Sequence, residues 1–232
     1  MRFLLLFLFV PGFCMGQKIT DERNFILKTS LISYVDQLSF PTVQFGLERK
    51  ISGNLSVAGE LGYQFYEFKR YGVDTTFVNT RGLKANVEFR RYNILKLFRR
   101  IYESSEDMTG VYLAINFFYR GSRFNNNVYY LKPGDSVNSN DCFWVKKTIW
   151  GGNLVLGIQK NIGNRFTIDI FSGLGVMYRT AHNFQREYND KTDLLITPID
   201  VNARAEFNRA GLAENNGWHP GFNAGIRMGI RF

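Results

Sequence analysis

The feature that most constrains this chain of 232 residues is an alternation of apolar and polar residues with a period of two. It is clearest in the segment FNAGIRMGIRF, residues 222–232, where apolar or alanine positions alternate with Asn, Gly and Arg. The same pattern recurs in residues 55–65, 83–90 and 111–120. Since successive side chains of a β-strand point to opposite faces, each segment predicts a strand with one apolar and one polar face.

The whole pattern predicts an all-β fold, an eight-stranded antiparallel transmembrane β-barrel with long extracellular loops. The connections after the second and sixth segments are tight, whereas those after the third, fifth and seventh are long and polar, as in outer-membrane barrels. Residues 35–41 are short for an outer loop, and residues 94–108 are long for an inner turn and could form a helix. Residues 199–207 read as an extra strand above the barrel. The eight strands are expected at 24–34, 42–51, 54–69, 81–93, 110–122, 148–161, 165–181 and 221–232.

Alternation alone does not say which face lies inside. A soluble barrel would place its apolar face inward around a small apolar ligand, and this periplasmic binder remains an alternative. The membrane reading is favoured by aromatic residues at strand ends on the apolar face, such as Tyr63, Tyr119 and Trp150, because membrane barrels carry aromatic girdles. The final Phe232 completes an apolar face, which predicts a recognition signal for the barrel assembly machinery.

In a membrane barrel the polar face lines the lumen. An eight-stranded barrel is just wide enough for side chains to fill it, so the sequence predicts a closed interior rather than a diffusion pore. No cofactor or metal is expected, since neither an HxH nor a CxxC pair occurs. The predicted lumen charges are Lys28, Glu48, Glu60, Lys84, Glu88, Arg120, Asp169, Arg227 and Arg231.

The N-terminal residues predict export. A basic residue, a short apolar run at 3–10 and small residues before Gln17 are typical of a signal peptide over residues 1–16. The run is too short to span a membrane as a helix. Phe13 before Cys14 disfavours a lipoprotein signal, and removal of Cys14 would leave Cys142 without an internal disulfide partner. We therefore expect one mature domain, residues 17–232, in the cell outer membrane.

Four runs of the sequence carry a resemblance: RGLKANVEFRRYN, TGVYLAINFFYR, GNRFTIDIFSGLGVMYR and PGFNAGIRMGIRF. They resemble strands of a family of uncharacterised small outer-membrane barrels, a domain of unknown function common in Bacteroidota-type bacteria. In architecture this family is similar to the OmpA membrane domain and OmpX. The resemblance implies a fold and a location but no activity. Because the last predicted strand ends the chain, we expect no periplasmic domain for binding peptidoglycan.

An enzymatic function is the main competing hypothesis, because lipid A-modifying enzymes exist on such barrels. His182 and His219 lie at the two ends of one predicted outer loop. A catalytic triad would need Ser122, Ser136 or Ser139 with Glu187 or Asp190. No spacing motif supports such a triad, so we expect a protein that is not an enzyme.

The formal net charge of +9 suggests an anionic partner. Acidic residues outnumber basic ones in loop 182–220, so the positive excess lies on the strands, where it can face internal carboxylates or the phosphates of outer-membrane lipid and lipopolysaccharide. No basic stripe supports binding to nucleic acid. The aromatic and Asn-rich loop at 124–145 instead predicts contact with a surface protein or glycan. Its expected contact residues are Tyr129, Tyr130, Phe143 and Trp144.

Overall fold

The computed structural model describes residues 24–30, 42–64, 78–94, 108–189, 191–196 and 216–232. These residues form nine strands and no helix that could cross a membrane. The strands are β1 (Phe25–Ser30), β2 (Val43–Ser52), β3 (Leu55–Gln64), β4 (Val78–Tyr92), β5 (Gly110–Leu131), β6 (Ser139–Ile162), β7 (Phe166–Phe184), β8 (Leu194–Leu195) and β9 (Gly217–Arg231).

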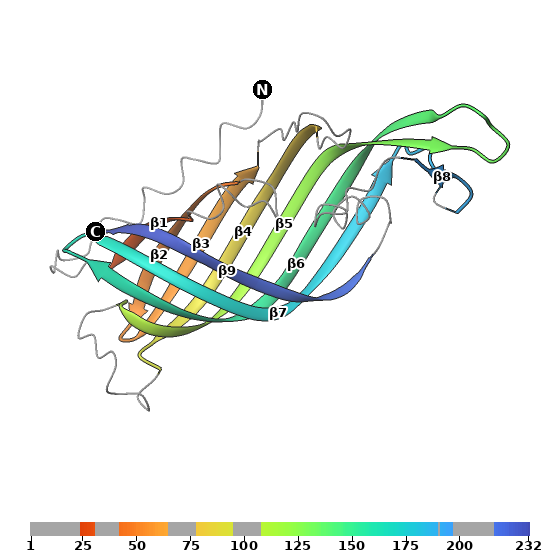
Figure 1. Ribbon diagram of the computed structural model, residues 1–232. Helices are drawn as coiled ribbons and strands as arrows, with labels where there is room; N and C mark the ends of the chain where they lie inside the picture. The colour runs from red at the N-terminus through yellow and green to blue at the C-terminus, as the bar shows by residue number, and fades with distance from the viewer. Residues whose placement is uncertain (1–23, 31–41, 65–77, 95–107, 190, 197–215) are drawn as a thin grey trace, which may run out of the picture.

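The eight longer strands form a ring in one antiparallel sheet (Figure 1). Each strand from β1 to β6 pairs with the next one along the chain, β7 pairs with β9, and β9 returns to pair with β1. The short strand β8 lies outside this ring and pairs with Tyr130 and Leu131 of β5. The expected all-β antiparallel architecture with eight main strands is therefore confirmed.

The two ends of the ring differ. At the turn end, tight turns join β2 to β3 and β6 to β7, and Gly53 and Gly163 adopt positive φ angles of 45° and 62° there. The chain terminus lies at the same end, where the backbone N–H of Phe232 donates to the carbonyl of Phe25 at 2.9 Å. At the opposite end, β5 and β6 extend past the neighbouring strands as a long hairpin (Figure 1). We call this the hairpin end.

The length of this hairpin corrects the sequence prediction. Residues 123–147 were expected to be a loop, yet β5 runs to Leu131 and β6 begins at Ser139. The pairing continues without a break from Gly110–Gln159 to Tyr130–Ser139. The Asn-rich segment looks like a loop in sequence, but alternating apolar residues on both strands pack together and hold it as a strand pair. The predicted signal peptide, the helix or turn at 94–108 and the strand at 199–207 lie wholly or mostly outside the described residues.

Side chains alternate between the two faces of the ring as the period of two requires. The outward side chains are mostly large, apolar and exposed, while the inward ones are buried and combine many polar and charged groups with a smaller apolar cluster that includes Ile26, Val155 and Phe171. The outward set includes Phe45, Leu61, Phe89, Ile115, Phe117, Leu154, Leu156, Ile170, Leu174 and Phe222.

Candidate functional site

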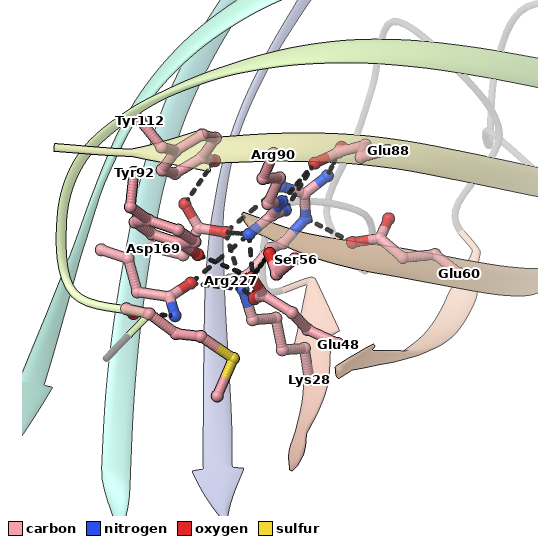
Figure 2. Close-up of polar contacts among 12 residues, drawn as sticks. Lys28, Glu48, Ser56, Glu60, Glu88, Arg90, Tyr92, Tyr112, Asp169 and Arg227 are labelled. Carbon is pink, nitrogen blue, oxygen red and sulfur yellow. Dashed lines mark hydrogen bonds and ion pairs between the residues drawn. The ribbon is translucent and has the colours of Figure 1, made fainter. Parts of the chain in front are cut away.

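The interior of the ring near the turn end is filled by an ionic network (Figure 2). Arg90 of β4 is its centre and is 1% exposed. Its guanidinium group lies 2.5 Å from Glu88, 2.9 Å from Asp169 and 3.1 Å from Glu48. One arginine therefore joins carboxylates from β2, β4 and β7, and it ties together strands that are not neighbours in the sheet.

Two further cations complete the network. Arg227 of β9 contacts Glu60, lies 2.5 Å from Glu88 and lies 3.3 Å from Asp169. Lys28 of β1 lies 2.5 Å from Glu48 and 3.1 Å from Asp169. Because every carboxylate of the network contacts at least one cation, these acids are held as ion pairs rather than left available as catalytic bases.

Neutral polar groups add further hydrogen bonds to this network. The hydroxyl groups of Tyr92 and Ser56 donate to Glu48 at 2.7 and 2.5 Å, and that of Tyr112 donates to Asp169 at 2.7 Å. The amide of Gln159 donates to the carbonyl of Met108 at 2.7 Å. Such hydrogen bonds offset the cost of burying the charged groups, since an ion without partners is costly to bury.

The predicted lumen charges fall into three places. Lys84 and Arg120 line a small cavity of about 70 Å³ above the network, on the side of the hairpin end. Arg231 is half-buried close to the turn end. The other six belong to the network: Lys28, Glu48, Glu60, Glu88, Asp169 and Arg227.

The sequence reading missed Arg90, the most connected residue of the network. Its signal was present, because Arg90 shares the polar face of its strand with Glu88. It lies near a predicted strand end, where an arginine looks like a rim residue. The partner residues Tyr92, Tyr112 and Gln159 were missed as well, since aromatic and amide side chains do not mark a lumen in sequence.

Further cations lie on the interior face toward the hairpin end. Lys147 of β6 is three residues beyond Trp150. Burial lowers the pKa of Lys147 to about 8, and the nearby charges of Arg179 and Arg120 act in the same direction. The interior is therefore ionically paired near the turn end and rich in positive charge near the hairpin end.

The polarity of the two faces inverts along β5. On the outer face, the odd-numbered positions from 113 to 119 are Leu, Ile, Phe and Tyr. Beyond them, the same face carries Gly121, Arg123 and Asn125. On the inner face, Asn116 and Arg120 stand among apolar residues such as Phe118, and beyond them the face carries Phe124, Val128 and Tyr130, all three of which are buried.

The same inversion occurs at the matching level of β6. Its outer face is apolar from Ile158 up to Trp150, with the exposed Lys160 nearer the turn end, and beyond Trp150 it carries Thr148 and Lys146. Its inner face combines the polar Gln159 and Asn153 with the buried Val155 in the ring, and it becomes apolar at Val145 and Phe143. Since Gly121 pairs with Thr148, both strands change at one level of the sheet.

The projecting hairpin has an apolar core of its own. Phe124, Val128, Tyr130, Phe143, Val145 and Tyr188 form one buried cluster, against which Leu195 packs. The carboxylate of Asp141 accepts hydrogen bonds from the backbone N–H groups of Glu187 and Tyr188 at 2.7 and 2.9 Å. The segment after β7 is thereby fastened to the hairpin.

This cluster corrects the predicted contact residues. Tyr130 and Phe143 are 1% and 0% exposed, so they serve as packing residues and cannot contact a partner. Trp144 and Tyr129 are half-buried, and the guanidinium of Arg123 lies 4.4 Å from the centre of the Trp144 ring. In sequence, a buried and an exposed aromatic residue look the same.

The two histidines of the competing enzymatic hypothesis lie on opposite faces of the sheet. His182 is exposed on the outer face of β7, whereas His219 lies on the interior face of β9. Within the part of the chain that the structure describes, no group of three His, Cys, Asp or Glu residues could hold a metal ion. Cys142 is an exposed free thiol on the hairpin.

Comparisons with protein-family models, with curated proteins and with solved structures find no match for this chain.

Proposed function

We propose that this protein is an integral outer-membrane β-barrel that presents its β5–β6 hairpin at the cell surface, where it contacts a partner protein or a surface glycan. In this proposal the ring of strands is a closed transmembrane barrel, with its turn end in the periplasm. The barrel has a structural and displaying role and carries out no catalysis.

The observation that carries the proposal is the inversion of polarity along β5 and β6. The face of a strand that its surroundings solvate well stays exposed, and the other face is buried: in water the polar face is exposed, and in lipid the apolar face is exposed. Below the level of Gly121 and Thr148 the exposed face is apolar, as expected in contact with lipid, and above it the exposed face is polar, as expected in water. A soluble barrel would keep one polarity along the whole strand, and its interior would be apolar rather than ionic.

The height of the apolar surface supports the same proposal. On β7 the apolar part of the outward face begins at Phe166 and ends at Tyr178, twelve residues later. At about 3.3 Å per residue this is about 40 Å along the strand. At the roughly 40° tilt of membrane barrels it corresponds to about 30 Å along the membrane normal. The hydrocarbon core of a bilayer has about this thickness.

The exposed thiol of Cys142 gives a direct test of orientation. A maleimide that does not cross membranes, applied to intact cells, is expected to label the protein, and the variant Cys142→Ser is expected to lose the label. Labelling that requires disruption of the outer membrane would contradict the surface location. On an SDS gel without boiling, the extracted protein is expected to migrate differently from the boiled sample, as a folded barrel does.

The interior network supports a barrel without a stable pore. Arg90 of β4 meets Asp169 of β7 across the interior, Arg227 of β9 lies beside Asp169, and each of the three is about 1% exposed. The purified protein in planar bilayers is therefore expected to give no steady conductance. Stable openings on the nanosiemens scale would show that the network does not close the interior.

The hairpin is the element to test for partner binding. Replacing residues 124–145 by a short Gly–Ser turn is expected to abolish binding to cell-surface proteins or glycans while the shortened barrel still shows heat-modifiable migration. The control is Lys132→Gln at the hairpin tip, which leaves the buried cluster intact. Loss of the folded barrel on deletion would mean that the hairpin is a packing element.

A further inference from the structure

The outer surface of β5, β6, β7 and β9 carries two parallel rows of side chains at the level where polarity inverts. The first is an aromatic row of Trp150, Tyr178 and Trp218, whose ring centres lie 5.3 to 5.7 Å apart. These residues are cross-strand neighbours. Aromatic side chains with polar tips favour the boundary between hydrocarbon and water.

The second row is cationic and lies farther toward the hairpin end. Arg123 pairs with Lys146, and Lys146 pairs with His182, so the three side chains are neighbours on the outer face. All three are exposed. The ring of Trp144 lies 4.4 Å from the Arg123 guanidinium, which favours an ordered position for this charge.

No carboxylate balances this row on the same surface of the three strands. β5 contains no Asp or Glu, and the single acids of β6 and β7, Asp141 and Asp169, are buried. The surface therefore has positive charge immediately above an aromatic boundary, which is complementary to an anionic lipid headgroup.

The spacing of the rows narrows the kind of lipid. Lys146 is four residues from Trp150, and His182 is four residues from Tyr178. Four residues span about 13 Å along a strand, or about 10 Å along the membrane normal at a tilt of roughly 40°. A glycerophospholipid carries its phosphate close to the acyl chains, whereas a phosphorylated glycolipid carries phosphate on sugars that lie beyond them.

We call the aromatic row, the cationic row above it and the adjacent Trp144 the strip. We infer that this strip binds a phosphorylated glycolipid, a lipid A-type molecule of the outer leaflet. Arg123, Lys146 and His182 bind its phosphate groups, while the aromatic row packs where the sugars of the lipid meet its acyl chains. The inference rests on the proposed membrane location and adds a specific lipid partner to it. Arg and Lys are well suited to this role, since both donate charge-assisted hydrogen bonds to phosphate.

The three tryptophans of the chain, Trp144, Trp150 and Trp218, all lie on this strip, so their fluorescence reports on it directly. The experiment titrates the folded protein in dodecyl maltoside micelles with dansyl-labelled bisphosphorylated lipid A and measures energy transfer from tryptophan. Unlabelled lipid A, dephosphorylated lipid A and phosphatidylglycerol are then added as competitors. Lipid A is expected to compete at least about tenfold better than the other two. Equal competition by phosphatidylglycerol or by the dephosphorylated lipid would overturn the inference.

The variant Arg123→Gln/Lys146→Gln is expected to weaken binding roughly thirtyfold, since each cation near an anionic surface contributes about 1 kcal/mol. The charge-preserving variant Arg123→Lys/Lys146→Arg is expected to retain most of the affinity. The matched control is Lys132→Gln/Lys191→Gln, which removes the same charge from exposed positions away from the strip and is expected to change binding less than about twofold. Equal weakening by this control would also overturn the inference.

Membrane integration is measured separately, by heat-modifiable migration and by recovery in the membrane fraction. A wild-type protein that integrates but does not prefer phosphorylated lipid A would refute the lipid site alone. A wild-type protein recovered in soluble form would refute the proposed membrane location and the lipid site with it.

Discussion

The ring and the projecting hairpin share strands β5 and β6, yet their interiors are stabilised in opposite ways. In the ring, the inner side of β5 and β6 contributes polar groups to a buried region centred on the Arg90, Asp169 and Glu88 ion pairs. In the hairpin, the inner side of the same strands supplies an apolar cluster. The alternation of residues therefore determines which side chains share a face. Whether the polar or the apolar face is buried depends on the surroundings at each level of the strand.

The largest effect should come from breaking the ring interior. Arg90→Met leaves Glu48, Glu88 and Asp169 without their shared cation, and removal of one partner from a buried ion pair costs about 3 to 5 kcal/mol. The urea midpoint of the heat-modifiable form is expected to fall strongly or the ring to fail to form. Lys132→Met on the exposed hairpin tip is the control. An unchanged midpoint for Arg90→Met would mean that the network does not hold the ring together.

The next test places the same charged side chain on the exposed face of each region. Leu154→Arg places a charge on the exposed apolar face of β6, where lipid contact should cost about 2 to 4 kcal/mol in a bilayer. Asn140→Arg places the same charge on the exposed part of the hairpin and should cost less than about 0.5 kcal/mol. Unfolding in lipid vesicles measures both. Similar small costs would argue against a membrane on that face.

A smaller and local effect is expected from the hairpin. Asp141→Ala removes the acceptor of the N–H groups of Glu187 and Tyr188, which should cost about 1 to 3 kcal/mol. Hydrogen exchange is expected to accelerate at these two amides while the ring amides stay protected. Asp135→Ala in the hairpin turn is the control. Faster exchange throughout the ring would show that the two regions are not independent.

The smallest effect concerns Lys147, at the boundary between the regions. Because the pKa of Lys147 is lower in the folded protein than in the unfolded chain, its positive charge destabilises the folded state. This cost is complete below about pH 8 and absent above pH 10.5. Lys147→Met is expected to raise stability at pH 7 by roughly 1 to 2 kcal/mol, allowing for its partial exposure. Because the wild type loses this cost as the pH rises, the difference between the two proteins should vanish above that pH. A constant difference would contradict the assignment.

Much of the ring could be read from the sequence because it follows a strictly local rule. The alternation at 222–232 and 111–120 identifies strands, their two faces and the polarity of each, and tight glycine turns such as Gly53 mark where they reverse. Six of the predicted lumen charges indeed come together, since residues on one face of a ring must share its interior.

The sequence did not predict where the strands end or which aromatic residues are buried. The segment at 124–145 reads as an Asn-rich loop, and its strand character depends on Phe143 and Val145 meeting Phe124 and Val128 across the hairpin. Arg90 was overlooked because its role depends on carboxylates from β2 and β7.

The sequence by itself determined the strands and their alternating faces, since side-chain direction in a strand is a property of neighbouring residues. Only the tertiary structure decided which cation meets which carboxylate, that Tyr130 is buried while Trp144 stays partly exposed, and that Arg123, Lys146 and His182 form one row. These contacts depend on the register between strands. Register depends on the apolar pattern of both paired strands and on the geometry of the turn that joins them, so no single strand encodes it.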